Sequence, residues 1–136
     1  MALLYNARVL FRGIEHPALA SPDPARLARW YAETLGFPIA WEDGKTPPAY
    51  LLKTPSGGLL EIIPAREAAA KPPRRDDPGL RHLAIQVDDF DAAHDDLRRK
   101  GVRFLAEPSS GYGNRVVFFT DCDGNILHLI QRGQVL

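Results

Sequence analysis

The sequence GIEHPALASPDP at residues 13–24 decides the fold, because a variant of it returns as GLRHLAIQVDDF at residues 79–90. His82 follows His16, and Asp89 follows Asp23, by the same 66 residues. Similarity at a constant offset is typical of a duplicated structural unit. The chain is therefore expected to contain the same unit twice.

Each copy continues with a helix. Asp23 is placed to cap the first backbone N–H groups, and Pro24 suits the first helical position. An apolar stripe follows, which consists of Leu27, Trp30, Tyr31 and Leu35. Gly36 is suited to a left-handed helix end. The second copy repeats this pattern over residues 88–101 and ends with basic residues that complement the helix dipole.

Short β-type segments follow each helix and are separated by turn residues. They are predicted at residues 37–41, 49–53, 59–63, 102–106, 115–120 and 126–131. Each unit is then β-α-β-β-β, and the fold class is α+β. We expect one domain over residues 1–136, with module one at about 8–65, a linker at about 66–78 and module two at about 79–133.

Composition excludes several classes of protein. A chain of 136 residues has the length of a single domain, and its 45% hydrophobic residues are enough to form a hydrophobic core. Its 17 basic and 17 acidic residues balance, so no net charge draws it to nucleic acid or anionic lipid. No apolar stretch approaches the roughly 20 residues that span a bilayer, and no leader pattern opens the chain. The lone Cys122 allows no internal disulfide, and we expect a cytoplasmic protein.

Four residues at equivalent positions of the repeat suggest a metal site. His16 and His82 are predicted on the first strands, and Glu61 and His128 lie among apolar neighbours on the last strands. Alternation places Gln86 on the same face as His82. A buried carboxylate is costly without a partner, and a cation held jointly with imidazoles provides one. This donor set suits Zn, Fe, Mn, Co or Ni.

Several motifs resemble the vicinal oxygen chelate superfamily, which includes lactoylglutathione lyase, methylmalonyl-CoA epimerase, extradiol dioxygenases and the fosfomycin and bleomycin resistance proteins. They are the opening strand, the helix end TLGF at residues 34–37, LLEIIP at 59–64, and DCDGNILHLIQ at 121–131. The resemblance implies that the two modules form a cupped mixed sheet around a central cavity. One divalent metal in that cavity would chelate two neighbouring substrate oxygens, with His16, Glu61, His82 and His128 as the ligands.

The sequence departs from the family at His128, where a Glu usually stands and can supply a carboxylate for proton transfer. Glu61 or a metal-bound hydroxide is then the candidate base, and His128 acts as one only when the metal does not hold it. Our leading hypothesis is a metal-dependent lyase or isomerase of glyoxalase type. The alternatives are an extradiol-type dioxygenase, with Glu61 supplying the carboxylate, and a resistance protein that binds a drug or metabolite.

Four further residues are predicted to contact a small-molecule substrate: Trp41, Gln86, Tyr112 and Arg115. Tyr112 and Arg115 belong to a Gly-rich segment at residues 108–115 that forms either a mobile lid or a hairpin connection. Trp41 offers an aromatic surface for stacking. We expect a homodimer, because open sheets with apolar faces commonly bury them against a partner.

Overall fold

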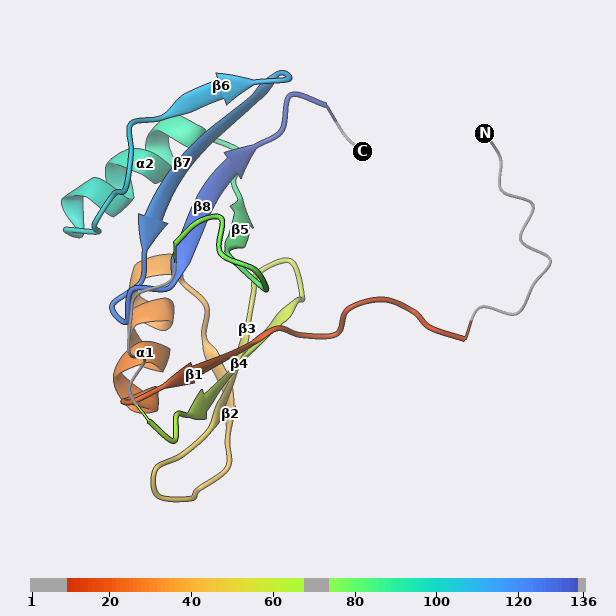
Figure 1. The fold of residues 1–136 in the computed structure, drawn as a ribbon, viewed down its shortest axis with the longest axis vertical. Helices are drawn as coiled ribbons and strands as arrows, with labels where there is room; N and C mark the ends of the chain where they lie inside the picture. The colour runs from red at the N-terminus through yellow and green to blue at the C-terminus, as the bar shows by residue number, and fades with distance from the viewer. Residues whose placement is uncertain (1–9, 68–73, 135–136) are drawn as a thin grey trace.

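The computed structural model describes residues 10–67 and 74–134, which form two modules of the same architecture (Figure 1). Module one contains β1 (Ala18–Ser21), α1 (Pro24–Trp30), the π-helical turn η1 (Tyr31–Leu35), β2 (Ile39–Glu42), β3 (Tyr50–Lys53) and β4 (Leu59–Pro64). Module two contains β5 (Leu83–Gln86), α2 (Phe90–Arg99), β6 (Ser109–Gly111), β7 (Asn114–Thr120) and β8 (Ile126–Gln131). The predicted α+β class and the tandem β-α-β-β-β units are confirmed.

The two sheets share one topology and one register. Their strand orders are β1-β4-β3-β2 and β5-β8-β7-β6, and in each the outer first strand runs parallel to the last strand. Ala18 pairs with Glu61 in the first sheet, and Ala84 pairs with His128 in the second. The sequence repeat is therefore also a repeat of strand register, which places equivalent residues on equivalent faces.

The predicted helix signals are confirmed. The Asp23 carboxylate accepts a hydrogen bond from the Arg26 N–H at 3.1 Å, and Asp89 accepts one from the Ala92 N–H at the same distance. Gly36 ends the first helix with a left-handed φ of 73°. Its lack of a Cβ is what makes this conformation accessible without strain.

Two predictions of strand position are wrong. Residues 102–106 form no strand, because only Phe104 bridges to β7, through an isolated pairing with Phe119. Pro108 then follows, and it has no N–H to continue a ladder. The second strand of module two is β6, which forms a tight hairpin with β7, so the Gly-rich segment at residues 108–115 is a hairpin connection. His16 and His82 also lie just before β1 and β5 rather than within them.

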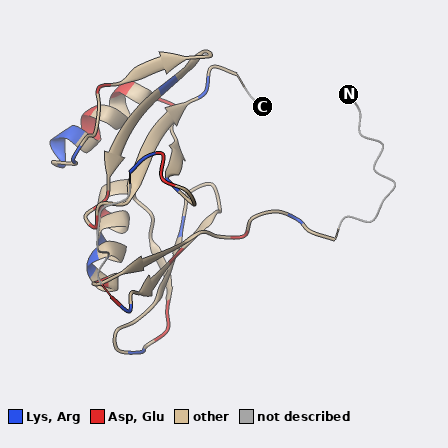
Figure 2. Ribbon diagram, in the orientation of Figure 1, with Lys and Arg blue, Asp and Glu red and all other residues tan. Residues whose placement is uncertain are grey.

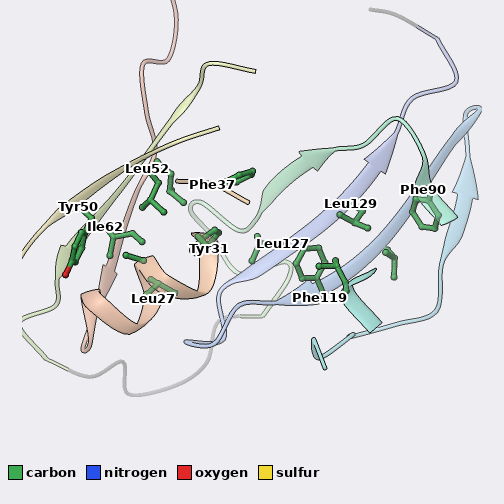
Figure 3. Close-up of a cluster of buried hydrophobic side chains, with 14 residues drawn as sticks. Leu27, Tyr31, Phe37, Tyr50, Leu52, Ile62, Phe90, Phe119, Leu127 and Leu129 are labelled. Atoms are coloured by element: carbon green, nitrogen blue, oxygen red, sulfur yellow. The ribbon is translucent and has the colours of Figure 1, made fainter. Parts of the chain in front are cut away.

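One hydrophobic core extends across both modules. Its side chains come from both helices and from the strands behind them, as Figure 3 shows for Tyr31, Phe37, Leu127 and Phe119 among others. The helices lie on one side of the sheets, so the opposite side is free for a site (Figure 1). No helix in the described ranges is long and apolar enough to cross a membrane.

Polar contacts also join the modules. The Tyr31 hydroxyl of module one donates to Asp121 of module two at 2.8 Å, and the Ser21 hydroxyl donates to Asp123 at 2.5 Å. Burial raises the pKa of Asp121, while hydrogen bonds from Tyr31, from the Asn125 side chain and from two backbone N–H groups oppose that rise. We call the Tyr31–Asp121 and Ser21–Asp123 pairs the inter-module clasp.

Charged residues are mixed in sign along the outside of the chain (Figure 2). On α2, Asp95 pairs with Arg98 at 2.9 Å and Asp96 with Lys100 at 2.6 Å. These pairs are exposed and contribute little to stability. The predicted linker at residues 66–78 falls partly outside the described residues, and its described ends contain neither helix nor strand.

Candidate functional site: a His–Glu pair and a His–His pair

The first pair consists of His16 and Glu61. Glu61 lies in the middle of β4, and His16 precedes β1, the neighbouring parallel strand. The His16 Nε2 atom lies 3.7 Å from a Glu61 carboxylate oxygen, and both side chains are about one third exposed. His16 Nδ1 contacts the Glu15 carboxylate. That hydrogen bond, followed by the negative charges of Glu15 and Glu61, raises the pKa of His16.

The second pair consists of His82 and His128, at the equivalent positions of module two. Their ring centroids lie 4.7 Å apart. His128 is buried, and its Nδ1 lies 3.1 Å from the Leu129 carbonyl oxygen. A hydrogen bond from Nδ1–H to that oxygen leaves Nε2 with a free lone pair, as metal-binding histidines require. Burial lowers the pKa of His128 and so favours this neutral form.

A cleft of about 300 Å³ lies between the two modules. It is lined on one side by residues 17–20, at and just before β1, and on the other by residues 80–83, which lead into β5. Of the four predicted ligands, His82 lines this cleft and the other three do not. Ala18, the register partner of Glu61, lines it from module one.

The donor types fit a divalent transition metal, since three imidazoles and one carboxylate are ligands that such ions accept. Within the described residues, however, no three His, Cys, Asp or Glu side chains are close enough to share an ion. The four predicted ligands thus form two separate pairs, which we call half-sites. A shared ion would require the two half-sites to move closer together.

Two of the predicted substrate residues share a face with the pairs. Trp41 on β2 is half exposed and pairs with Leu51, which in turn pairs with Glu61. Trp41 therefore lies in the same cross-strand row as Glu61. Gln86 is exposed and lies on the same face of β5 as Ala84, the partner of His128.

The other two predicted substrate residues lie away from the pairs. Tyr112 is fully exposed at the tip of the β6–β7 hairpin, with a φ of 52°. Arg115 lies on the helix side of the second sheet, where its guanidinium stacks 4.4 Å from the Phe90 ring centroid and pairs with Asp91 at 3.0 Å. The structure brings neither of them to the histidine face.

Sequence reasoning missed Arg75 as a residue near the site. Its guanidinium carbon lies 4.7 Å from the Phe118 ring centroid. Phe118 pairs with His128 across β7 and β8, and the two rings lie 4.9 Å apart. No local signal in the polar linker marks Arg75, because its position depends on how residues 74–82 return over the sheet.

A second cavity, of about 690 Å³, lies at the module boundary on the side of α2. It is lined by the end of the first helix, the β3–β4 turn, β5 and one face of α2. None of the four predicted metal ligands lines it. Of the predicted site residues, Gln86 lines this larger cavity, whereas His82 lines the smaller cleft.

The sequence pattern of the glyoxalase/bleomycin resistance protein/dioxygenase superfamily matches residues 13–129. The chain belongs to this superfamily. The match covers both half-sites and confirms the resemblance drawn from the repeated motifs. Superfamily members bind small molecules, and this superfamily fold supports both enzymes and binding proteins.

Known proteins with similar sequences or structures agree with this assignment. The uncharacterized protein YwkD of Bacillus subtilis is 28% identical over 91% of this chain and 100% of its own length. Human mitochondrial methylmalonyl-CoA epimerase is 26% identical over 87% of this chain and 73% of its own. The crystal structure of TnmS3, an antibiotic binding protein from Streptomyces sp. CB03234, has a TM-score of 0.73 at 20% identity, covering 92% of this chain and 99% of that one. This last likeness concerns the fold.

Proposed function

We propose that this superfamily member is a metal-dependent lyase or isomerase of glyoxalase type. Its substrate would be a small molecule with two neighbouring oxygens, such as a hydroxycarbonyl or dicarbonyl compound. The observation that carries the proposal is the pairing of His16 with Glu61 in module one and of His82 with His128 at the equivalent positions of module two, with His82 lining the cleft between the modules.

The proposed ligands are His16, Glu61, His82 and His128, which would hold one ion of Zn, Ni, Fe, Mn or Co. When bound, such an ion polarises a substrate oxygen as a Lewis acid. The chain's own groups then orient the substrate and move its proton. Glu61 is the proposed base, because it is the one carboxylate among the four and its side chain is about one third exposed. The hydrogen bond at His128 Nδ1 orients that ring.

The relationship with methylmalonyl-CoA epimerase supports proton transfer rather than oxygenation as the leading proposal. The dioxygenase and the drug- or metabolite-binding protein remain the competing functions. Oxygen consumption with Fe(II) and a catechol would favour the first. Tight binding of an unmodified ligand by metal-free protein would favour the second.

Metal content tests the proposal. Tag-free protein purified without chelators, or reconstituted with each candidate ion, is analysed for bound metal beside His16→Ala and His128→Ala. His94→Ala is the matched control, since His94 is the remaining histidine, lies on α2 and packs on the Phe104 ring. We expect one ion per site in the parent and the control, and its loss in the other two variants. Absence of metal after every reconstitution contradicts the proposal.

The base is tested separately. Glu61→Gln keeps an oxygen donor but removes the proton acceptor, so we expect turnover to fall by about 100-fold or more while metal is retained. Unchanged turnover would show that Glu61 is not the base. Retained metal distinguishes this outcome from simple loss of the site.

We also propose a cytoplasmic homodimer. The segment before β1 exposes large apolar side chains, with Phe11 88% and Ile14 93% accessible, and a second copy of the chain is a natural cover for them. Sedimentation analysis of the parent beside Phe11→Ser tests this. A monomeric parent at micromolar concentration contradicts the dimer.

A further inference from the structure

A segment that contains three arginines and two aspartates passes over the histidine face of the second sheet. This segment, residues 74–81, is here called the strap, and it runs in green across β8 toward β5 in Figure 1. At its start, the Arg75 guanidinium stacks on the Phe118 ring at 4.7 Å. The same ring lies 4.9 Å from His128 and 5.8 Å from His82, measured between centroids. The Phe118 ring therefore positions the Arg75 guanidinium near the second half-site.

Hydrogen bonds fix the shape of the strap. The backbone N–H of Arg74 donates to Asp77 at 2.7 Å, and the Arg74 side chain donates to the same carboxylate at 3.3 Å. At the other end, the Arg81 guanidinium donates to the Arg74 carbonyl oxygen at 3.3 Å. These hydrogen bonds restrain the turn that contains Arg75, which reduces the conformational entropy that Arg75 loses when it binds a ligand.

Arg75 keeps its hydrogen-bond donors available. Asp77 is the carboxylate of the strap that pairs with Arg74 and Arg81, and within the described residues no ion pair involves Arg75. Stacking on Phe118 occupies the flat face of the guanidinium and leaves its N–H edges free. Those edges match the two oxygens of a carboxylate in a bidentate geometry.

The two half-sites also differ in charge. Glu15 and Glu61 lie beside His16 in module one, whereas in module two the cations Arg132 and Arg75 both act electrostatically on His128. An anionic group is repelled by the first half-site and attracted by the second. The charge distribution therefore gives an anionic substrate one preferred orientation.

We propose that Arg75 and Phe118 form a carboxylate-binding subsite, and that the substrate is a small anion whose carboxylate stands next to a carbonyl or hydroxyl oxygen. The carboxylate binds the N–H edge of Arg75, and the neighbouring oxygen faces His82 and His128. The second half of this statement rests on the proposed function of the same site, whereas the anion subsite does not require the metal.

A matched pair of ligands tests the subsite. Pyruvate and butane-2,3-dione have nearly the same shape and both present adjacent oxygens, but only pyruvate is an anion. Dissociation constants are measured by NMR titration of the full chain, metal-loaded and chelator-treated. We expect pyruvate to bind at least tenfold more tightly than the dione in both forms.

Variants locate the effect. Arg75→Gln should weaken pyruvate binding by about tenfold and leave the dione unchanged, while Arg75→Lys, which keeps the charge without the fork, should give an intermediate value. Arg74→Gln is the control, because its side chain pairs with Asp77 in the same turn. Inorganic phosphate is titrated in parallel, and binding tighter than that of pyruvate would contradict the carboxylate assignment.

Three results would overturn the inference. The first is no pyruvate binding up to about 50 mM ligand, which is about the weakest binding that such a titration resolves. The others are equal affinity for the dione, and an equal loss of pyruvate affinity in Arg75→Gln and Arg74→Gln. These outcomes are separable from failure of the proposed function. A protein that holds no metal yet binds pyruvate through Arg75 retains the subsite and loses the metal mechanism. A protein that holds metal but binds pyruvate equally well without Arg75 retains the metal mechanism and loses the subsite.

Discussion

The inter-module clasp allows a sharp test of what holds the two repeats together. Tyr31→Phe removes one hydroxyl and keeps the aromatic ring that packs against Phe37. The lost group donates to Asp121 at 2.8 Å, and both side chains are buried. The partner is a carboxylate, so the hydrogen bond is charge-assisted, and such bonds contribute about 1.5–3 kcal/mol.

We therefore expect Tyr31→Phe to lower the free energy of unfolding by about 2 kcal/mol. Urea unfolding followed by circular dichroism measures this as a lower midpoint with an unchanged slope. At roughly 3 °C per kcal/mol for a domain of this size, the melting temperature falls by about 6 °C. Tyr50→Phe is the matched control, because Tyr50 is also buried but its hydroxyl makes no hydrogen bond within the described residues.

The control should change the free energy of unfolding by less than about 0.5 kcal/mol. A double variant with Asp121→Asn should lose less than the sum of the single changes, because the two residues share one interaction. Equal stability of Tyr31→Phe and the parent, or strict additivity with Asp121→Asn, would refute the idea that this pair joins the modules.

Three further predictions concern helix capping, pH and the hairpin. Asp89→Ala should cost about 1 kcal/mol of unfolding free energy in urea, because it removes the cap of α2, whereas Asp88→Ala should cost little. Burial lowers the pKa of His128, so its contribution to stability is full above the ordinary histidine value of about 6.5 and is lost as pH falls below that value. His128→Asn should therefore flatten the decline in melting temperature from pH 7 to 5. An unchanged decline would contradict this role of His128. Tyr112→Gly should stabilise slightly or stay neutral in thermal unfolding, because the positive φ of 52° suits glycine, and a loss above 1 kcal/mol would contradict this.

Local signals predicted most of the secondary structure. The caps at Asp23 and Asp89 and the stop at Gly36 use interactions within a few residues, so they are visible in the sequence. Residues 102–106 had the composition of a strand but formed only a bridge at Phe104, because strand pairing depends on what lies alongside. The choice between lid and hairpin at residues 108–115 likewise depended on the pairing of β6 with β7.

The candidate site was predictable in part for the same reason. The repeat made His82 the equivalent of His16 and His128 the equivalent of Glu61, and the common register of the two sheets places Glu61 and His128 at equivalent positions. Arg115 could not be assigned to a face from the sequence, and it lies on the helix side against Phe90. Its strand alternates, but the starting point of that alternation is set by contacts with β8.

The sequence by itself determined the duplicated β-α-β-β-β unit, the superfamily and the four ligand-type residues, because periodicity, capping and repetition are properties of the chain order. Only the tertiary structure decided that these four residues stand as two pairs, with His82 lining the cleft between the modules, and that Arg75 returns from the linker to Phe118. Contacts between residues distant in sequence depend on how whole modules pack. The clasp between Tyr31 and Asp121, 90 residues apart, is such a contact, and no local pattern encodes it.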